Sequence, residues 1–244
     1  MERFRIQKKL SMYQMDPVGS LRPLMLMNEL QTYADMHAEK LGVGHSFCRE
    51  SGLAWVALFY SVDIPRMPTG GDEIVLETWP STRDGIRTTR DFLITDAGTG
   101  EVLVRATSQW VMIDMATRRP VPFEGRVPKF DLDGTRALDV PFEKFPDFAP
   151  DFSEVVVPRY DDYDINRHIN NAVYAVWATE ALGKEFRAGH RLRGISLNFK
   201  KEIPIEVDGL KIETARGGLK SRHRISNGES MHAYVVCEWE EIKN

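Results

Sequence analysis

Long apolar stretches and cysteine clusters are missing from this sequence. No apolar run approaches the roughly 20 residues that a membrane-spanning helix requires. The two cysteines, Cys48 and Cys237, do not have the spacing of metal ligands. Residues 1–16 show neither the apolar core and cleavage site of a signal peptide nor an organellar transit peptide. We therefore expect a cytoplasmic protein with reduced, buried cysteines, no membrane span and no metal site.

An excess of charge of one sign is also missing. The 32 basic and 36 acidic residues leave a net charge of −4, which gives no argument for a nucleic-acid partner. Hydrophobic residues make up 42% of the chain and charged residues 28%, which are ordinary values for a soluble globular protein. The 244 residues are enough for one large domain or two small ones with a substantial core.

The most informative stretch runs from Asp161 to Leu182 and begins with polar groups that can do chemistry. Asp164, Asn166 and His168 alternate, and in an extended segment every second side chain points the same way. The pattern therefore predicts a carboxylate, a carboxamide and an imidazole on one face. A single histidine near a helix start is more often structural than catalytic, and the residues alone leave both interpretations open.

The second part of this stretch predicts a buried helix. Residues 172–182 contain no glycine or proline and are apolar nearly all round. Asn170 or Asn171 is suited to cap the N-terminus of this helix. The polar trio would then lie where backbone N–H groups and the positive end of the helix dipole gather.

The rest of the chain predicts a second helix, ten strands and a linker. The helix begins at Pro23 and extends to Leu41, with His37 as a packed helix residue. Six of the thirteen prolines and several phenylalanines lie between residues 120 and 150, which indicates a linker held against a surface. The predicted strands are 4–15, 54–64, 73–80, 86–95, 101–115, 152–160, 192–201, 209–215, 219–225 and 230–242.

The two halves of the chain repeat one another. Residues 68–78 align without a gap with residues 204–214, and Trp110 corresponds to Trp239. This register places Arg66 opposite Glu202. The first half has Asp16-Pro-Val-Gly-Ser where the second half has the polar trio, so the trio is not repeated. We expect an N-terminal substrate-binding half (1–119), a linker (120–150) and a C-terminal catalytic half (151–244).

The motif Asp164-x-Asn166-x-His168-x-Asn-Asn, followed by Tyr174 and Trp177, resembles the plant-type acyl-ACP thioesterases (ACP, acyl carrier protein) and their bacterial relatives. Residues 53–119 and 197–202 resemble the same family. The resemblance implies an α+β double hotdog fold, in which a long helix wrapped by an antiparallel sheet occurs twice. It also implies hydrolysis of fatty acyl-ACP to fatty acid and holo-ACP in fatty acid biosynthesis, without a cofactor.

The resemblance also implies roles for the site residues. His168 and Glu202 would position and deprotonate water, and Asp164 would orient the imidazole. Asn166, together with N–H groups near Asn170 and Asn171, would donate hydrogen bonds to the oxyanion.

The attacking group is predicted to be water. By resemblance, Glu202 matches a glutamate of the family's active site, but the cysteine that follows it in the family is Ile203 here. A thiol mechanism is therefore not expected. Trp55 is a candidate for contact with the acyl chain in the first half, as are Met25 and Tyr60.

Other functions and several partner surfaces stay open. A hotdog enzyme could instead cleave an acyl-CoA or dehydrate a hydroxyacyl chain, and a non-catalytic acyl-binding module would use the trio as a structural network. A homodimer is possible. Acyl carrier protein is acidic, so its docking surface should be basic. The candidate clusters are Arg83, Arg87 and Arg90; Arg118 and Arg119; Lys200 and Lys201; and Lys220, Arg222 and Arg224.

Overall fold

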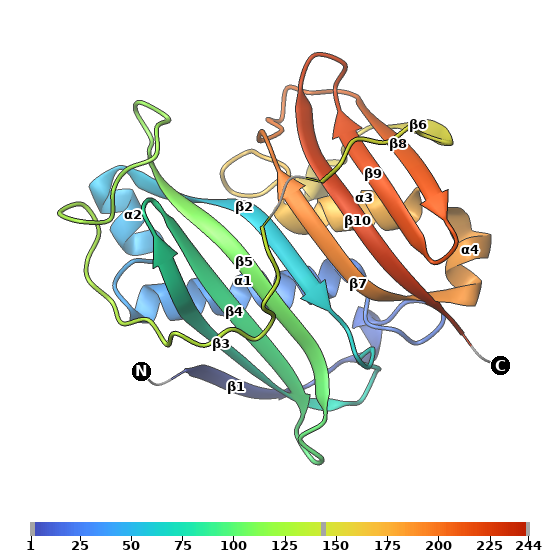
Figure 1. Ribbon diagram of the computed structural model, residues 1–244, viewed down its shortest axis with the longest axis horizontal. Coiled ribbons are helices and arrows are strands. Elements are labelled where there is room, and N and C mark those ends of the chain that lie inside the picture. Colours follow the sequence, from blue (N-terminus) through green and yellow to red (C-terminus); the bar gives the residue numbers. More distant parts are fainter. Residues whose placement is uncertain (1–2, 143–144, 243–244) are drawn as a thin grey trace. The chain divides into compact units, whose positions relative to one another are not determined.

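The computed structural model describes residues 3–142 and 145–242 (Figure 1). The chain divides into two compact units that alternate along the sequence. Unit 1 comprises residues 1–10, 28–66 and 71–142, and unit 2 comprises residues 11–27, 67–70 and 143–244. Within the described residues, no helix combines the length and apolarity needed to cross a membrane.

Unit 1 is an antiparallel sheet with a long helix against it. In its described residues the strand order is β1-β3-β4-β5-β2. Lys8 of β1 pairs with Glu29 of helix α1 at 2.8 Å, and Arg90 of β4 contacts His37 of the same helix at 3.1 Å. The elements are β1 Phe4–Lys9, α1 Pro23–Lys40, α2 His45–Ser51, β2 Leu53–Asp63, β3 Glu73–Asp84, β4 Arg87–Asp96 and β5 Val102–Asp114. The first turn of α1, residues 23–27, is assigned to unit 2.

Unit 2 repeats this plan. The strand order in its described residues is β7-β10-β9-β8-β6, again antiparallel. Helix α3 lies against β7, β8 and β10, and its residues 172–175 and 177–179 are buried, as the apolar pattern predicts. The elements are β6 Phe152–Val156, α3 Asn171–Glu180, α4 Gly183–Gly189, β7 His190–Phe199, β8 Leu210–Gly217, β9 Lys220–Ser226 and β10 Met231–Glu241.

The predicted α+β double hotdog fold is confirmed, since each unit is a helix laid on an antiparallel sheet. The first strand ends at Lys9 rather than Met15, because Met12–Gln14 forms a 3-10 turn (η1). The sequence did not predict the short helices α2 and α4. The proposed boundaries between halves and linker stay a prediction.

The internal duplication is visible in the strand registers. In unit 1 the register shifts beside Trp110, where β2 passes from Ala57 to Phe59. In unit 2 it shifts beside Trp239, where β7 passes from Leu192 to Gly194. The two tryptophans therefore occupy the same place in their sheets, as the alignment predicts.

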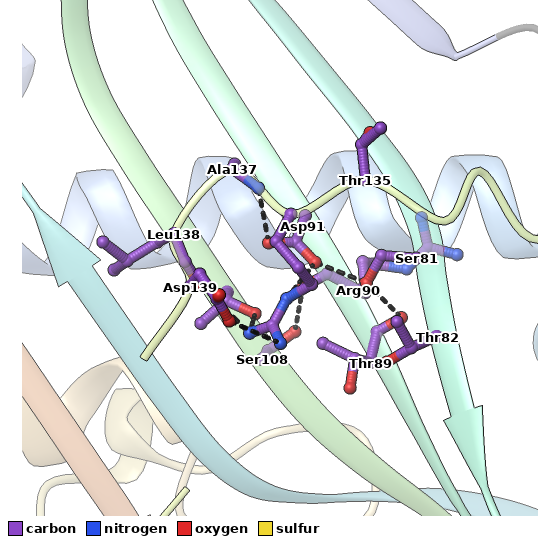
Figure 2. Close-up of polar contacts among 12 residues, drawn as sticks. Ser81, Thr82, Thr89, Arg90, Asp91, Ser108, Thr135, Ala137, Leu138 and Asp139 are labelled. Carbon is purple, nitrogen blue, oxygen red and sulfur yellow. Dashed lines mark hydrogen bonds and ion pairs between the residues drawn. The ribbon is translucent and has the colours of Figure 1, made fainter. Parts of the chain in front are cut away.

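The segment after β5 is held against the sheet of unit 1. Phe123 is buried, and the ring of Phe142 packs against Phe59. Figure 2 shows residues 135–139 crossing the strands, with the Ala137 N–H directed at the Asp91 carboxylate. This fully buried carboxylate accepts from Ala137 N–H at 2.9 Å and from Ser81 Oγ at 2.5 Å.

Asp91 also pairs with the guanidinium of Arg136, whose Nε lies 3.2 Å from Oδ2. Burial raises the pKa of Asp91, while the Ser81 hydroxyl and the Arg136 charge act in the opposite direction. The same guanidinium lies 3.7 Å from Asp139, whose side chain is 89% exposed. One arginine thus has one buried and one exposed carboxylate partner.

We expect Asp91→Ala to lower the free energy of unfolding by about 3 kcal/mol, because it removes the partners of a buried hydroxyl and a largely buried cation. Asp139→Ala is the matched control and should leave stability nearly unchanged, since exposed pairs contribute little. Urea unfolding of both variants measures the difference. Equal effects would show that the buried carboxylate does not hold the 135–139 segment.

Candidate active site

Residues 164–168 form a tight turn that contains the polar trio. The Asp164 N–H donates to the His168 carbonyl at 2.8 Å. Asp164 Oδ1 accepts from the backbone N–H groups of Asn166 at 2.8 Å and His168 at 3.2 Å. Arg167 closes the turn with a left-handed φ of 63°. The carboxylate thus bonds the backbone of its own loop.

This turn corrects the prediction of an extended segment with alternating side chains. A short carboxylate can satisfy N–H groups two and four residues ahead only when the chain folds back on it. The two shorter hydrogen bonds of Asp164 are therefore from backbone groups of the loop, and its role in orienting the imidazole stays a prediction. We interpret Asp164 as the residue that shapes the loop.

A backbone bridge sets the distance between His168 and Glu202. His168 is bridged to Pro204, and the Ile169 N–H donates to the Ile203 carbonyl at 2.9 Å. Ile203 is fully buried, which anchors the segment that follows β7. His168 Nδ1 consequently lies 3.8 Å from Glu202 Oε1, and their side chains are 27% and 35% exposed. This distance is too long for a direct hydrogen bond, but water can reach both groups.

The start of helix α3 is capped by Asn170, one of the two residues predicted for this place. Its Oδ1 accepts from the Ala172 N–H at 2.9 Å, and its carbonyl accepts from the Val173 N–H at 2.9 Å. Within the described part of the chain, no group accepts a hydrogen bond from the Asn171 N–H. This N–H is at the positive end of the helix dipole, where developing negative charge is stabilised.

Tyr174 of α3 is a buried tyrosine near the candidate site, and the chemistry of the sequence did not single it out. Its ring is buried and packs edge-on against Phe199 at 5.2 Å. Burial raises the pKa of the Tyr174 phenol, and the charges of Glu202 and then Asp164 raise it further. The phenol therefore lies within electrostatic range of both carboxylates. Tyr174 is one turn into the apolar helix, and apolar periodicity does not distinguish such a residue from core.

The Asn166 side chain is not joined to the His168–Glu202 pair by any hydrogen bond in the described residues, and Trp55 lies in the other unit. Trp55 belongs to unit 1, where its Nε1 donates to the Val43 carbonyl at 2.8 Å. The Asn166 side chain is exposed beside the Asp164 carboxylate, with a long 3.5 Å contact. Their roles toward substrate stay predictions.

A second loop of unit 2 has the same backbone hydrogen bonds but lacks the asparagine and the histidine. The Asp16 N–H donates to the Ser20 carbonyl at 2.8 Å, and Asp16 Oδ1 accepts from the N–H groups of Val18 at 3.0 Å and Ser20 at 2.9 Å. Gly19 has the left-handed φ, 79°. Val18 and Ser20 thus stand where Asn166 and His168 stand in the other loop, as the alignment predicts.

The residue of the first half that was predicted to be equivalent to Glu202 was wrong by one position. The Leu21 N–H donates to the Pro68 carbonyl as Ile169 donates to Ile203, so Met67 and not Arg66 is equivalent to Glu202. The turn after Pro68 is one residue shorter than the turn after Ile203, and an alignment without gaps misses this difference.

Arg66 instead serves unit 1. Its guanidinium pairs with Asp72 at 3.2 Å, Asp96 at 3.3 Å and Glu101 at 2.9 Å. Three carboxylates from different segments around one cation hold the connection between β2 and β3.

Neither cysteine has the environment of a nucleophile. Burial raises the pKa of the Cys48 thiol to about 11 and that of Cys237 to about 12. A reactive thiol needs a lowered pKa, so both groups remain protonated at neutral pH. Among the described residues, no cluster of three His, Cys, Asp or Glu side chains could hold a metal ion.

Comparison with protein families matches both halves of the chain. Residues 2–127 match the acyl-ACP thioesterase N-terminal domain, and residues 149–241 match the acyl-ACP thioesterase C-terminal domain. All of the site residues from Asp164 to Glu202 fall in the second match.

Individual relatives agree with this assignment. A palmitoyl-acyl carrier protein thioesterase of Gossypium hirsutum is 32% identical over 72% of this chain and 46% of its own length. A dodecanoyl-[acyl-carrier-protein] hydrolase of Umbellularia californica is 30% identical over 96% of this chain and 62% of its own. The chain thus spans about half to three-fifths of these relatives. The solved 12:0-ACP thioesterase from Umbellularia californica superimposes with a TM-score of 0.85 at 28% identity, covering 98% of each chain.

Bacterial structures share the fold. An acyl-ACP thioesterase from Bacteroides thetaiotaomicron has a TM-score of 0.85 at 22% identity and covers 97% of both chains. At this identity the likeness supports the architecture alone.

The turn at Asp164 generates a test that needs no substrate. Asp164→Ala removes the acceptor of two N–H groups, so we expect amide hydrogen exchange of Asn166 and His168 to accelerate at least about tenfold, since a hydrogen bond to a charged acceptor contributes about 1.5–3 kcal/mol. Asp164→Asn keeps an oxygen in the same place and should slow exchange back toward the wild-type rate. Asp16→Ala is the matched control, because it should release Val18 and Ser20 and leave the other loop unchanged. Unaltered exchange in Asp164→Ala would refute the loop-shaping role.

Proposed function

The chain belongs to the acyl-ACP thioesterase family, and we propose on this basis that it hydrolyses fatty acyl-ACP to a fatty acid and holo-ACP. The observation that carries the proposal is the His168–Glu202 pair, 3.8 Å apart and partly exposed beside the N-terminus of a buried helix. The equivalent loop of the first half has Ser20 and Met67 in these places, so only one half has the groups for hydrolysis.

The pair is suited to activate water. A water molecule in contact with both Glu202 and His168 can lose a proton to them while its oxygen attacks the thioester carbonyl. The new C–O bond forms, the C–S bond breaks, and the proton passes to the departing thiolate. A positioned general base contributes about 10²–10⁴-fold to such a step. Both side chains are partly exposed, which supports entry of water and of the thioester.

The negative charge on the carbonyl oxygen needs donors. The Asn166 carboxamide and the Asn171 N–H are the two that the loop and the helix start supply, since Asn170 already satisfies Ala172 and Val173. One such donor is worth about 10²–10³ in kcat. Asp164 supports this arrangement indirectly, because its turn presents Asn166 and His168 from one loop.

ACP would dock on a basic surface near this opening. Lys200 and Lys201 are exposed and immediately precede Glu202, which favours them among the basic clusters. Arg90 is buried and contacts His37, and Arg224 pairs with Glu213 at 3.2 Å, so neither presents an exposed charge. Trp55 in unit 1 is a candidate for contact with the acyl chain. Cytoplasmic location and a homodimer stay predictions from the sequence.

We expect the protein to release thiol from medium- or long-chain acyl-ACP faster than from acyl-CoA of the same length. His168→Ala should lose at least about a hundredfold in kcat, the lower end for loss of a general base. Ser20→Ala is the matched control at the equivalent position of the other loop and should keep the wild-type rate. A panel of acyl-ACPs of graded length measures all three proteins and also ranks the chain lengths.

Two outcomes would contradict the proposal. Equal or better turnover of acyl-CoA at every length would contradict the assignment of ACP as the carrier of the acyl chain. A His168→Ala protein that keeps half of the wild-type rate would show that hydrolysis does not use this site.

A further inference from the structure

His232 is a buried histidine on β10 that holds the chain just before Glu202. Its carbonyl accepts from the N–H groups of Lys200 at 2.8 Å and Lys201 at 3.3 Å. Its Nδ1 lies 3.0 Å from the Lys201 carbonyl. The side chain is 1% exposed. One residue therefore makes three contacts to the two residues that precede the Glu202 carboxylate.

The partner of the imidazole decides which ring nitrogen carries the hydrogen. Burial lowers the pKa of His232, although the Lys201 carbonyl acts in the opposite direction. A carbonyl oxygen can only accept, so Nδ1 is assigned the hydrogen and donates it. Nε2 is then an acceptor, and it is buried without a hydrogen-bond partner in the described chain. Burying such an atom costs free energy.

The backbone around His232 is a β-bulge that unit 1 also contains. In β10 the pairing with β9 passes from Met231 to Ala233, which leaves His232 as the extra residue. In β5 the pairing with β4 passes from Val102 to Val104, which leaves Leu103 as the extra residue. The Leu103 carbonyl accepts from the Arg66 N–H at 3.4 Å, as the His232 carbonyl accepts from Lys201.

The bulge of unit 1 shows that this backbone conformation forms without an imidazole. Leu103 is fully buried and forms the same bulge with an apolar side chain, so the fold at this place does not require histidine. The costly imidazole occurs in the half that has the His168–Glu202 pair, and it binds the backbone next to that pair. Bulges commonly re-aim side chains beside active sites.

We propose that His232 is a positioning residue, whose imidazole fixes the Lys201 carbonyl and so holds the Glu202 carboxylate toward His168. On the other side, Glu202 is followed by Ile203, whose carbonyl accepts from the Ile169 N–H. Glu202 is thus held from β10 before it and from the catalytic loop after it. The inference rests on the proposed function in taking Glu202 as the group that activates water.

Three substitutions of His232 test the placement of its donor. His232→Leu installs the residue of the first half and should lower kcat on acyl-ACP about tenfold to a hundredfold, as for a base displaced by about an ångström, with KM near the wild-type value. His232→Asn keeps an amide donor at the reach of Nδ1 and should restore most of kcat. His232→Gln carries the same amide one bond farther and should resemble His232→Leu.

A double-mutant cycle and a control exclude general destabilisation. If His232 acts through Glu202, His232→Leu should have little further effect in a Glu202→Gln background, because groups that act as a unit are not additive. His223→Asn is the control, since His223 is also buried in unit 2 but bonds Thr214 and Ser221. We expect it to lower Tm with kcat retained.

The outcomes distinguish this inference from the proposed function. A folded His232→Leu protein with the wild-type kcat, an additive double mutant, or an Asn variant no better than Gln would overturn the positioning role. If His232→Leu does not fold, the Asn and Gln pair decides. If the wild-type protein hydrolyses no acyl thioester, the proposed function fails, and a crystal structure of the variants decides the placement. Glu202 unmoved against His168 in that structure would overturn it.

Discussion

The candidate site depends on the backbone bridge between residues 168–169 and residues 203–204. His168 comes from a turn and Glu202 from the end of a strand, and neither element alone determines their separation. The bridge of His168 to Pro204 and the 2.9 Å hydrogen bond from Ile169 to Ile203 set it. Because Ile203 is fully buried, moving the bridge would expose core, so the 3.8 Å pair is preorganised by packing rather than by its own weak attraction.

The duplication shows which features belong to the fold and which to the chemistry. Asp16 and Asp164 make the same turn, and Leu103 and His232 occupy the same bulge. Aspartate thus makes the same backbone contacts in both loops, whether or not the histidine is present. His168, Glu202 and the His232 imidazole are confined to one half, where they take the places of Ser20, Met67 and Leu103. A copy of the same backbone without these three groups is thereby present in the same chain as an internal reference.

Much of the fold could be predicted from the sequence. Pro23, Gly42 and the apolar period predict α1, and Asn170 before an apolar run predicts the start of α3. The geometry of the candidate site was harder to predict from the sequence. The alternation from Asp164 to His168 suits a strand. The Asp164 carboxylate instead accepts hydrogen bonds from its own loop and stabilises a turn, and an alternating sequence does not distinguish the two conformations.

Other features depend on contacts between distant residues. The turn after Pro68 is one residue shorter than the turn after Ile203, so the residue equivalent to Glu202 is Met67 and not Arg66. No local sequence pattern indicates this difference in length. His232 lies thirty residues after Glu202 in sequence and meets the Lys200–Lys201 backbone only through the pairing of β7 with β10. The sequence pattern of β10 does not distinguish this histidine from core.

Direct attack by water at the His168–Glu202 pair is the central claim, and a single turnover in ¹⁸O-labelled water tests it most directly. With enzyme in excess over acyl-ACP, the account predicts that the fatty acid carries one ¹⁸O after the first turnover, and that the peptide containing Glu202 carries none. Label in that peptide, or an acyl group trapped on the protein, would mean that a side chain attacks the thioester first and would contradict the account.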